Sequence, residues 1–173
     1  MRIIRILALL LLGMWLGAAV FFSASVAPNV FGVLRGADLA SASSLAGSIV
    51  SPLLATLNRA GFEIAIFLLV MSFFLTVGQT LIPRLAHLLS LAVLATTTAV
   101  GHWVIAARIA ALRTALTLPI DQIPPSDERR IAFDSLHRYS VLLFAVAILA
   151  AAVAFVLIGC GREPSRQTSP NQA

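Results

Sequence analysis

The sequence predicts an all-α fold, a membrane four-helix bundle made of two antiparallel transmembrane hairpins. The main observation is a set of four long apolar runs, at residues 6–26, 62–82, 86–107 and 139–158. Each run reaches the roughly 20 residues that a helix needs to cross a hydrocarbon core about 30 Å thick. Backbone amides in lipid must form hydrogen bonds within their own segment, so we expect helices rather than isolated strands. Residues 1–160 thus form one transmembrane domain.

The composition supports the same class. Hydrophobic residues make up 60% of the chain and charged residues 11%, with a mean hydropathy of +0.98, whereas soluble domains are about half apolar and about a quarter charged. The net charge of +5 favours contact with anionic lipid, and no nucleic-acid-binding motif is present. We therefore expect the lipid bilayer as a partner and no nucleic acid. The single cysteine, Cys160, excludes an intrachain disulfide.

The first run follows two basic residues, Arg2 and Arg5, as the apolar part of a secretory signal does. It is longer than such a segment, and Pro28 follows the best cleavage site, so we expect an uncleaved first helix with a kink at the proline. Gly13 and Gly17 form a G-x-x-x-G pattern, which lets helices approach closely. We expect this face to pack inside the bundle, and a homodimer face is the alternative.

Residues 38–51 are rich in Ala, Ser and Gly, with apolar residues near helical spacing. We expect a short helix there, lying against the bundle or in the membrane interface. Pro52 fits the first turn of a following helix, predicted at residues 53–82. Pro83-Arg84 then forms a very short turn. The second and third spans are therefore predicted to be antiparallel neighbours.

Prolines separate the third helix from the fourth. The third helix can extend past the bilayer until Pro119 and Pro124-Pro125 break the chain. Ser126 is the expected N-cap of the fourth helix. The polar tail, residues 161–173, is expected to be disordered. Two hairpins place both termini on one side. The count of arginines on the two sides slightly opposes the cytoplasm for that side, whereas the basic residues before the first helix favour it, and we expect both termini in the cytoplasm.

Polar residues gather at the membrane face opposite the termini. Glu63, His102 and His137 are expected at this same face. Ionisable groups near lipid are costly, so we expect them to be paired and to face the bundle or water. One interpretation is a hydrogen-bonded interfacial network. Its other members are Arg59, Arg108, Asp134 and Arg138.

The alternative interpretation is a ligand site. His102 and His137 are candidate ligands of a cofactor such as haem b, and with Glu63 as a metal-binding carboxylate they would suit a transition metal. The register opposes shared ligation, because His102 is expected about five residues, or roughly 7–8 Å, deeper than His137. We assign no catalytic residues and do not expect an enzyme, because the phosphate-binding glycine loop and the H-E-x-x-H, C-x-x-C and G-x-S-x-G motifs are lacking.

Several short motifs resemble those of one known family. They are Trp15-Leu16-Gly17, Phe21-Phe22, Ala27-Pro28 with Phe31, Leu45-Ala46-Gly47 with Leu53-Leu54, the pair Arg108 and Arg113, and Phe133-Asp134 with Leu136-His137-Arg138 and Ser140. Over residues 6–158 the chain is similar to the bacterial domain of unknown function 4149, which is related to eukaryotic transmembrane protein 205. The resemblance implies a four-helix protein of the bacterial inner membrane whose function is unassigned.

More distantly, that family is similar to the membrane domains of copper-resistance protein D and of the haem-containing protoporphyrinogen oxidase. This chain lacks the paired histidine and lysine pattern of the oxidase. Two functional hypotheses follow. The first is a non-enzymatic membrane protein that acts in transport, in stress tolerance or as a partner subunit. The second is a haem- or metal-binding redox protein that uses His102 and His137.

Overall fold

The computed structural model describes residues 2–37, 39–76, 80–116 and 118–160, and the regular elements among them are all helical. In chain order they are α1 (Arg2–Phe21), η1 (Phe22–Val26), α2 (Ala27–Gly36), α3 (Ala42–Leu75), α4 (Leu81–Ala99), η2 (Val100–Ala106), α5 (Ala107–Ala115), η3 (Ile120–Gln122) and α6 (Glu128–Cys160). The predicted all-α class is confirmed over these residues. The predicted disordered tail, 161–173, lies outside them.

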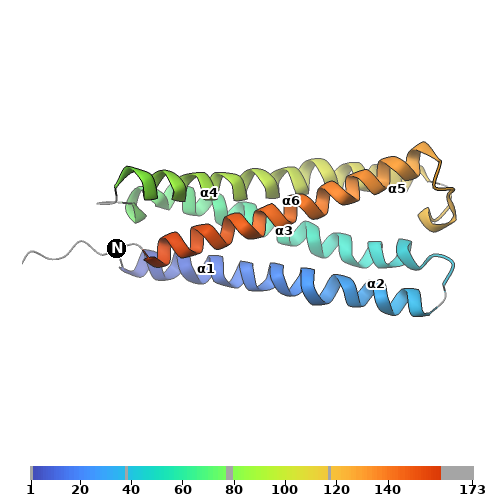
Figure 1. The fold of residues 1–173 in the computed structure, drawn as a ribbon, viewed down its shortest axis with the longest axis horizontal. Helices are drawn as coiled ribbons and strands as arrows, with labels where there is room; N and C mark the ends of the chain where they lie inside the picture. The colour runs from blue at the N-terminus through green and yellow to red at the C-terminus, as the bar shows by residue number, and fades with distance from the viewer. Residues whose placement is uncertain (1, 38, 77–79, 117, 161–173) are drawn as a thin grey trace, which may run out of the picture.

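The helices form four long segments, each long and apolar enough to cross a membrane, as predicted. They are Arg2–Gly36, Ala42–Ser72, Leu81–Ala115 and Glu128–Cys160. Figure 1 shows that they run along the long axis of the molecule. The start of α1, the break between α3 and α4 and the end of α6 lie at one end, which we call the terminal end. The α2–α3 and α5–α6 connections lie at the other, which we call the loop end.

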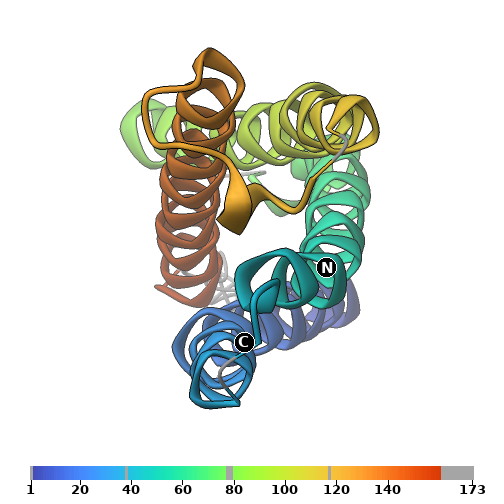
Figure 2. The ribbon, with the colours of Figure 1, turned by 90° about the vertical axis from the view of Figure 1, so that its right-hand side faces the viewer.

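Seen from the loop end, the four segments are arranged as a ring (Figure 2). α1 packs against α3 and α6, α4 packs against the same two helices, and α2 continues along α3. The core contains many small side chains, and Ala147, Ala151 and Ala154 of α6 are fully buried. Their spacing of three or four residues places them on one helix face. Small residues of this kind let the backbones of neighbouring helices approach closely.

Trp15 fixes α1 against α3. Its indole Nε1 donates a hydrogen bond to the Leu57 carbonyl at 2.8 Å, and its ring packs edge-on against Phe144 of α6 with 6.1 Å between ring centroids. The ring lies over Gly61, where a Cβ atom would stand 2.8 Å from ring carbons. The glycine therefore leaves the space that the buried indole occupies.

A π-helical turn, η1, makes room for Pro28. A proline inside an α-helix loses its N–H bond and clashes with the carbonyl four residues earlier. In η1 the Ala27 N–H bonds to the Phe22 carbonyl, five residues back. This wider turn precedes Pro28, and the chain continues as helix α2 as far as Gly36.

The predicted separate helix at residues 38–51 is wrong. α3 is continuous over Ala42–Leu75, with Pro52 in its interior. Pro52 is exposed, whereas Ala46 and Val50 are buried. An interior proline costs about 3 kcal/mol, and the burial of apolar side chains along the continuous helix offsets this cost.

The predicted second span, residues 62–82, crosses a break between two helices. α3 ends at Leu75 and α4 begins at Leu81, so the predicted turn at Pro83-Arg84 is wrong and these residues lie in the first turn of α4. The first N–H groups of a helix have no partner within it, so a first turn tolerates proline. α3 and α4 are still packed neighbours, as predicted.

Asp127, rather than the predicted Ser126, caps α6. Its Oδ1 accepts a hydrogen bond from the Arg129 backbone N–H at 2.8 Å, and its Oδ2 accepts one from Arg129 Nη2 at 2.9 Å. The carboxylate satisfies a free N–H group and interacts favourably with the helix dipole. The hydrogen bonds from Arg129 lower the pKa of Asp127 to about 2.

Candidate functional site

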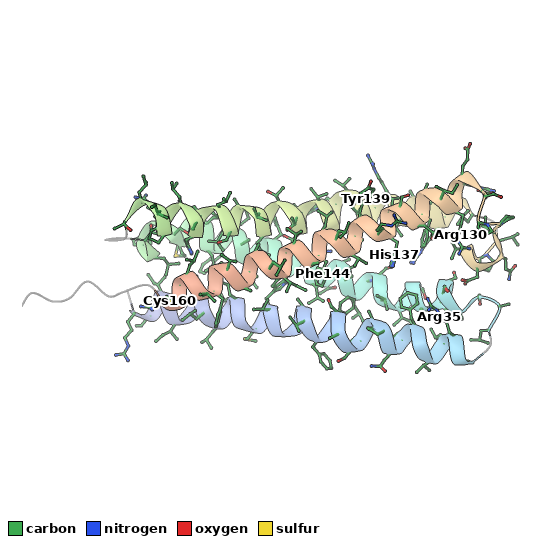
Figure 3. All side chains as sticks on the ribbon, in the orientation of Figure 1. Arg35, Arg130, His137, Tyr139, Phe144 and Cys160 are labelled. Atoms are coloured by element: carbon green, nitrogen blue, oxygen red, sulfur yellow. The ribbon has the colours of Figure 1, made fainter. Side chains whose placement is uncertain are left out.

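The loop end of the bundle contains a cavity of about 490 Å³. Side chains from α2, α3, η2, α5, η3 and α6 line it. Figure 3 shows three of its lining residues, Arg35, Arg130 and His137, at this end of the molecule. Along α3 the lining runs from Ser43 to Asn58, a rise of about 22 Å at 1.5 Å per residue. The cavity is therefore elongated along the bundle axis.

The mouth of the cavity, next to the connecting segments, is charged. Its ionisable residues are three arginines and two aspartates, namely Arg35, Arg113, Arg130, Asp121 and Asp134. Both carboxylates have partners within the protein. Asp134 Oδ2 lies 3.3 Å from Arg130 Nε, and Asp121 Oδ2 accepts a hydrogen bond from the Ser44 N–H in the first turn of α3 at 3.0 Å. The aspartates therefore do not neutralise the other two arginines.

Arg113 of α5 is held by neutral groups. Its Nη1 donates to the Gly47 carbonyl at 3.1 Å and to Ser51 Oγ at 3.2 Å, and its guanidinium carbon lies 5.6 Å from the Phe133 ring centroid. Gly47 leaves room for this approach, because a Cβ atom there would collide with the guanidinium. Among the described residues no carboxylate pairs with Arg113. The side chain is thus fixed in place with its charge uncompensated.

The deep end of the cavity, which we call the floor, is polar but uncharged. Asn58 and Ser140 line it and are only 4% and 8% exposed. The Asn58 amide rests against Gly101, where a Cβ atom would lie 3.1 Å from Nδ2. Neither the Asn58 amide nor the Ser140 hydroxyl makes a hydrogen bond to the described part of the chain. A buried polar group without a partner costs about 1–3 kcal/mol, so the floor offers hydrogen-bonding groups that the described chain leaves unmatched.

The connection between α5 and α6 crosses the loop end. Figure 2 shows it lying across the ring of helices. Ile120 and Ile123 of this connection are buried, and Arg130 Nη1 donates to both of their carbonyls, at 2.5 and 3.3 Å. With the Asp121 contact to α3, these bonds fix the connection against α3 and α6.

The predicted ligand residues have different surroundings. His102 Nδ1 donates to the Ala55 carbonyl of α3 at 3.0 Å. Glu63 is exposed and paired with Arg59 at 2.9 Å, whereas His137 lines the cavity. Within the described ranges, no group of three or more His, Cys, Asp or Glu side chains could hold a metal ion. The structure thus does not assemble these three residues into one metal site.

The other residues predicted from the sequence also differ in their surroundings. Asp134 lies in the cavity lining, but Arg108 and Arg138 are exposed and make no ion pair in the described ranges. Gly13 faces α6, since a Cβ atom there would lie 3.3 Å from the Phe155 ring, whereas nothing lies within 4 Å of that position at Gly17.

The sequence did not identify Arg113, Ser140 and Asn58 as residues of a site. Arg113 and Ser140 occur in the motifs of the family resemblance, but Asn58 does not. Its only signal is an amide side chain at the edge of a long apolar run.

A second polar pair lies toward the terminal end and is separate from the cavity. Ser72 and His87 are both 2% exposed, with Ser72 Oγ 3.0 Å from His87 Nε2. The single hydroxyl proton of Ser72 is donated to the Leu68 carbonyl at 2.7 Å, so the imidazole donates in the other contact. A histidine that donates to the hydroxyl cannot accept its proton, and the pair is therefore not an activated nucleophile.

No protein-family model, curated protein or solved structure matches this chain. Its function is therefore argued from the geometry of the cavity. Fixed cations at the mouth and unmatched hydrogen-bonding groups at the floor equip the cavity to bind a molecule.

Proposed function

We propose that this chain is a multi-pass membrane protein that binds a small molecule in the loop-end cavity without converting it, as a transport component or as a partner subunit. The observation that carries the proposal is Asn58. Its buried amide lines a cavity large enough for an organic molecule and lacks a hydrogen-bond partner in the described structure. Small-molecule sites of proteins combine apolar walls with a few convergent polar groups of this kind.

The exposed apolar surface supports a position in lipid. Large apolar side chains on all four segments are exposed, among them Phe21, Val70, Leu89 and Leu149 at 63–66%. Such a surface is stable in a hydrocarbon solvent and would aggregate in water. The proposed arrangement is therefore two antiparallel transmembrane hairpins, α1–α2 with α3 and α4–α5 with α6.

The exposed charged residues support one position of the bilayer along the helices. Arg59, Glu63, Arg108 and Arg138 are exposed, which supports a position for them at or beyond the membrane edge. From Arg138 to Cys160 the helix rises about 33 Å, close to the thickness of a hydrocarbon core. The loop end then projects beyond the lipid, so the cavity mouth faces water and its floor lies near the membrane edge.

We place the protein in the bacterial inner membrane with both termini in the cytoplasm. Arg2 and Arg5 before α1 support this orientation, and the family resemblance supports the bacterial origin. The cavity then opens on the side away from the cytoplasm.

The test of this function is access of a small neutral reagent to the cavity floor. We would introduce Ser140→Cys in a Cys160→Ser background, reconstitute the protein in nanodiscs and measure the rate of reaction with N-ethylmaleimide. Ala106 lines the cavity, whereas its neighbour Ala107 is exposed and does not. Ala106→Phe should therefore slow the reaction strongly, and Ala107→Phe should leave it unchanged. An unreactive cysteine, or equal rates in the two variants, would show that the cavity admits no ligand.

A further inference from the structure

We propose that the ligand is an organic anion with an apolar body, whose carboxylate or phosphate group binds to Arg113 and Arg35 at the cavity mouth. This inference rests on the proposed binding function and adds the chemical class of the ligand. Three features carry it: an uncompensated pair of arginines at the mouth, an apolar wall between mouth and floor, and unmatched polar groups at the floor.

The free donors of Arg113 define the site for the anion. A guanidinium has five N–H donors, and the two on Nη1 are used by Gly47 and Ser51. The Nε and Nη2 donors make no hydrogen bond with the described residues, and Nη2 packs against the backbone of α3 at Gly47. These donors form the edge of a guanidinium that binds a carboxylate or phosphate through two parallel hydrogen bonds. Because Nη1 is anchored, this edge is held in a fixed orientation before a ligand arrives.

Arg35 supplies a second positive charge to the same mouth. It lies in the last turn of α2, and its guanidinium carbon lies 5.6 Å from the Phe31 ring centroid. It has no ion-pair partner in the described ranges. Arg130, by contrast, is occupied by Asp134 and by two carbonyls of the α5–α6 connection. The mouth therefore attracts an anion through Arg113 and Arg35, while Arg130 has a structural role.

The middle of the cavity is apolar and favours a ligand with an apolar body. Between mouth and floor, the lining includes Val50, Leu54 and Ile109. A small inorganic anion at the mouth would leave this surface uncovered and would not reach Asn58. An organic chain attached to the anion covers the apolar wall, and its removal from water favours binding.

The floor selects a neutral polar group at the far end of the ligand. Asn58 offers both a donor and an acceptor, and Ser140 offers a hydroxyl. A hydroxyl, amide or ester carbonyl matches these groups, whereas an apolar end would leave them unsatisfied. Such molecules occur as membrane lipids of the adjacent leaflet and as soluble organic anions, and both sources share the chemistry of an anionic head on an apolar body.

Charge selectivity at the cysteine introduced at the floor tests the anion site. In the Ser140→Cys, Cys160→Ser protein we would compare two methanethiosulfonates of similar size, one carrying a sulfonate and one a trimethylammonium group. When each rate is divided by the rate of the same reagent with a free thiol, the sulfonate reagent should react faster than the trimethylammonium reagent. Arg113→Gln should remove this preference. Arg108→Gln, an exposed arginine of the same helix outside the lining, should keep it.

A second variant keeps the anion site testable if Arg113→Gln does not fold. Arg35→Gln breaks no ion pair or hydrogen bond of the described structure, and it should reduce the preference by itself. If N-ethylmaleimide reaches the introduced cysteine but the two charged reagents react equally, or if Arg113→Gln and Arg108→Gln behave alike, the anion site is refuted while the binding cavity stands. If N-ethylmaleimide itself does not enter, the proposed function fails.

Protection experiments identify the source of the ligand. 12-Hydroxydodecanoate, an anion with an apolar body and a terminal hydroxyl, should slow maleimide labelling of the introduced cysteine in phosphatidylcholine nanodiscs, and (12-hydroxydodecyl)trimethylammonium should not. Slow labelling in phosphatidylglycerol nanodiscs without an additive would identify a membrane lipid, whereas protection only by added 12-hydroxydodecanoate would identify a soluble anion. Equal protection by the anionic and the cationic compound, or none from either anionic source, would overturn the proposal.

Discussion

Glycines at three positions let a large side chain of one helix approach the backbone of another. Gly61 receives the Trp15 ring, Gly101 receives the Asn58 amide, and Gly47 receives the Arg113 guanidinium. The first contact fixes the bundle, and the other two shape the floor and the mouth of the cavity. Single residues thus connect the packing of the helices to the geometry of the site.

Gly61→Ala should destabilise the protein. The added methyl group would stand 2.8 Å from the buried Trp15 ring, and overpacking of this kind costs about 1–3 kcal/mol of unfolding free energy. Thermal unfolding in detergent, followed by tryptophan fluorescence, measures the effect. Gly17→Ala is the matched control, because nothing lies within 4 Å of the added atom in the described structure. Equal stability of the two variants would refute the assigned Trp15 contact.

Asp127 makes the start of α6 sensitive to acid. Its pKa is lowered to about 2 by the hydrogen bonds from Arg129, so its ionised form stabilises the folded state above the ordinary pKa of an aspartate, about 4. This contribution is lost as the pH falls from about 4 towards about 2. Asp127→Ala should therefore lower the melting temperature at neutral pH, and the difference from the unchanged protein should shrink over this acidic range. A difference independent of pH would contradict the assignment.

At the scale of the helices, α3 shows how burial can override a local signal. Pro52 is exposed in the interior of a continuous helix, whereas Pro83 lies in the first turn of α4. Both prolines indicate a helix boundary when only their sequence neighbours are considered. Their actual places depend on which side chains of the same helix are buried by the rest of the bundle.

Pro52→Ala should stabilise the protein. The substitution restores the N–H group that bonds to the Ser48 carbonyl in a regular helix, and the gain can reach about 3 kcal/mol. Pro83→Ala should have little effect, because the N–H group it restores has no partner in a first turn. Thermal unfolding of both variants in the same detergent checks this difference. A loss of stability in Pro52→Ala would contradict a continuous α3.

The four helical segments could be predicted from the sequence because long apolar runs determine them almost alone. The π-helical turns and the residues that end α3 could not, because they depend on hydrogen bonds and on packing between helices. Among the predicted polar residues, His137 and Asp134 belong to the cavity lining. Asn58, Gly101 and Arg113 were not predicted as a site, since they come from three elements and acquire a common role only when these elements pack together.

At the scale of the whole molecule, the helices are longer than a bilayer is thick. The α6 helix of 33 residues rises about 50 Å, whereas the hydrocarbon core is about 30 Å thick. We propose that this excess lies at the loop end, which contains the cavity. In the proposed arrangement, a rigid apolar bundle holds a water-facing binding site at the edge of the membrane.

The most direct test of this account is native mass spectrometry of the protein released from its own membrane. The unchanged protein and Ala107→Phe should each retain a non-covalently bound organic molecule, and Ala106→Phe should lose it because the phenyl ring fills the cavity. Fragmentation of the released molecule then identifies its head group. An unchanged protein that carries no such molecule, or an Ala106→Phe variant that retains it fully, would contradict a ligand in the loop-end cavity.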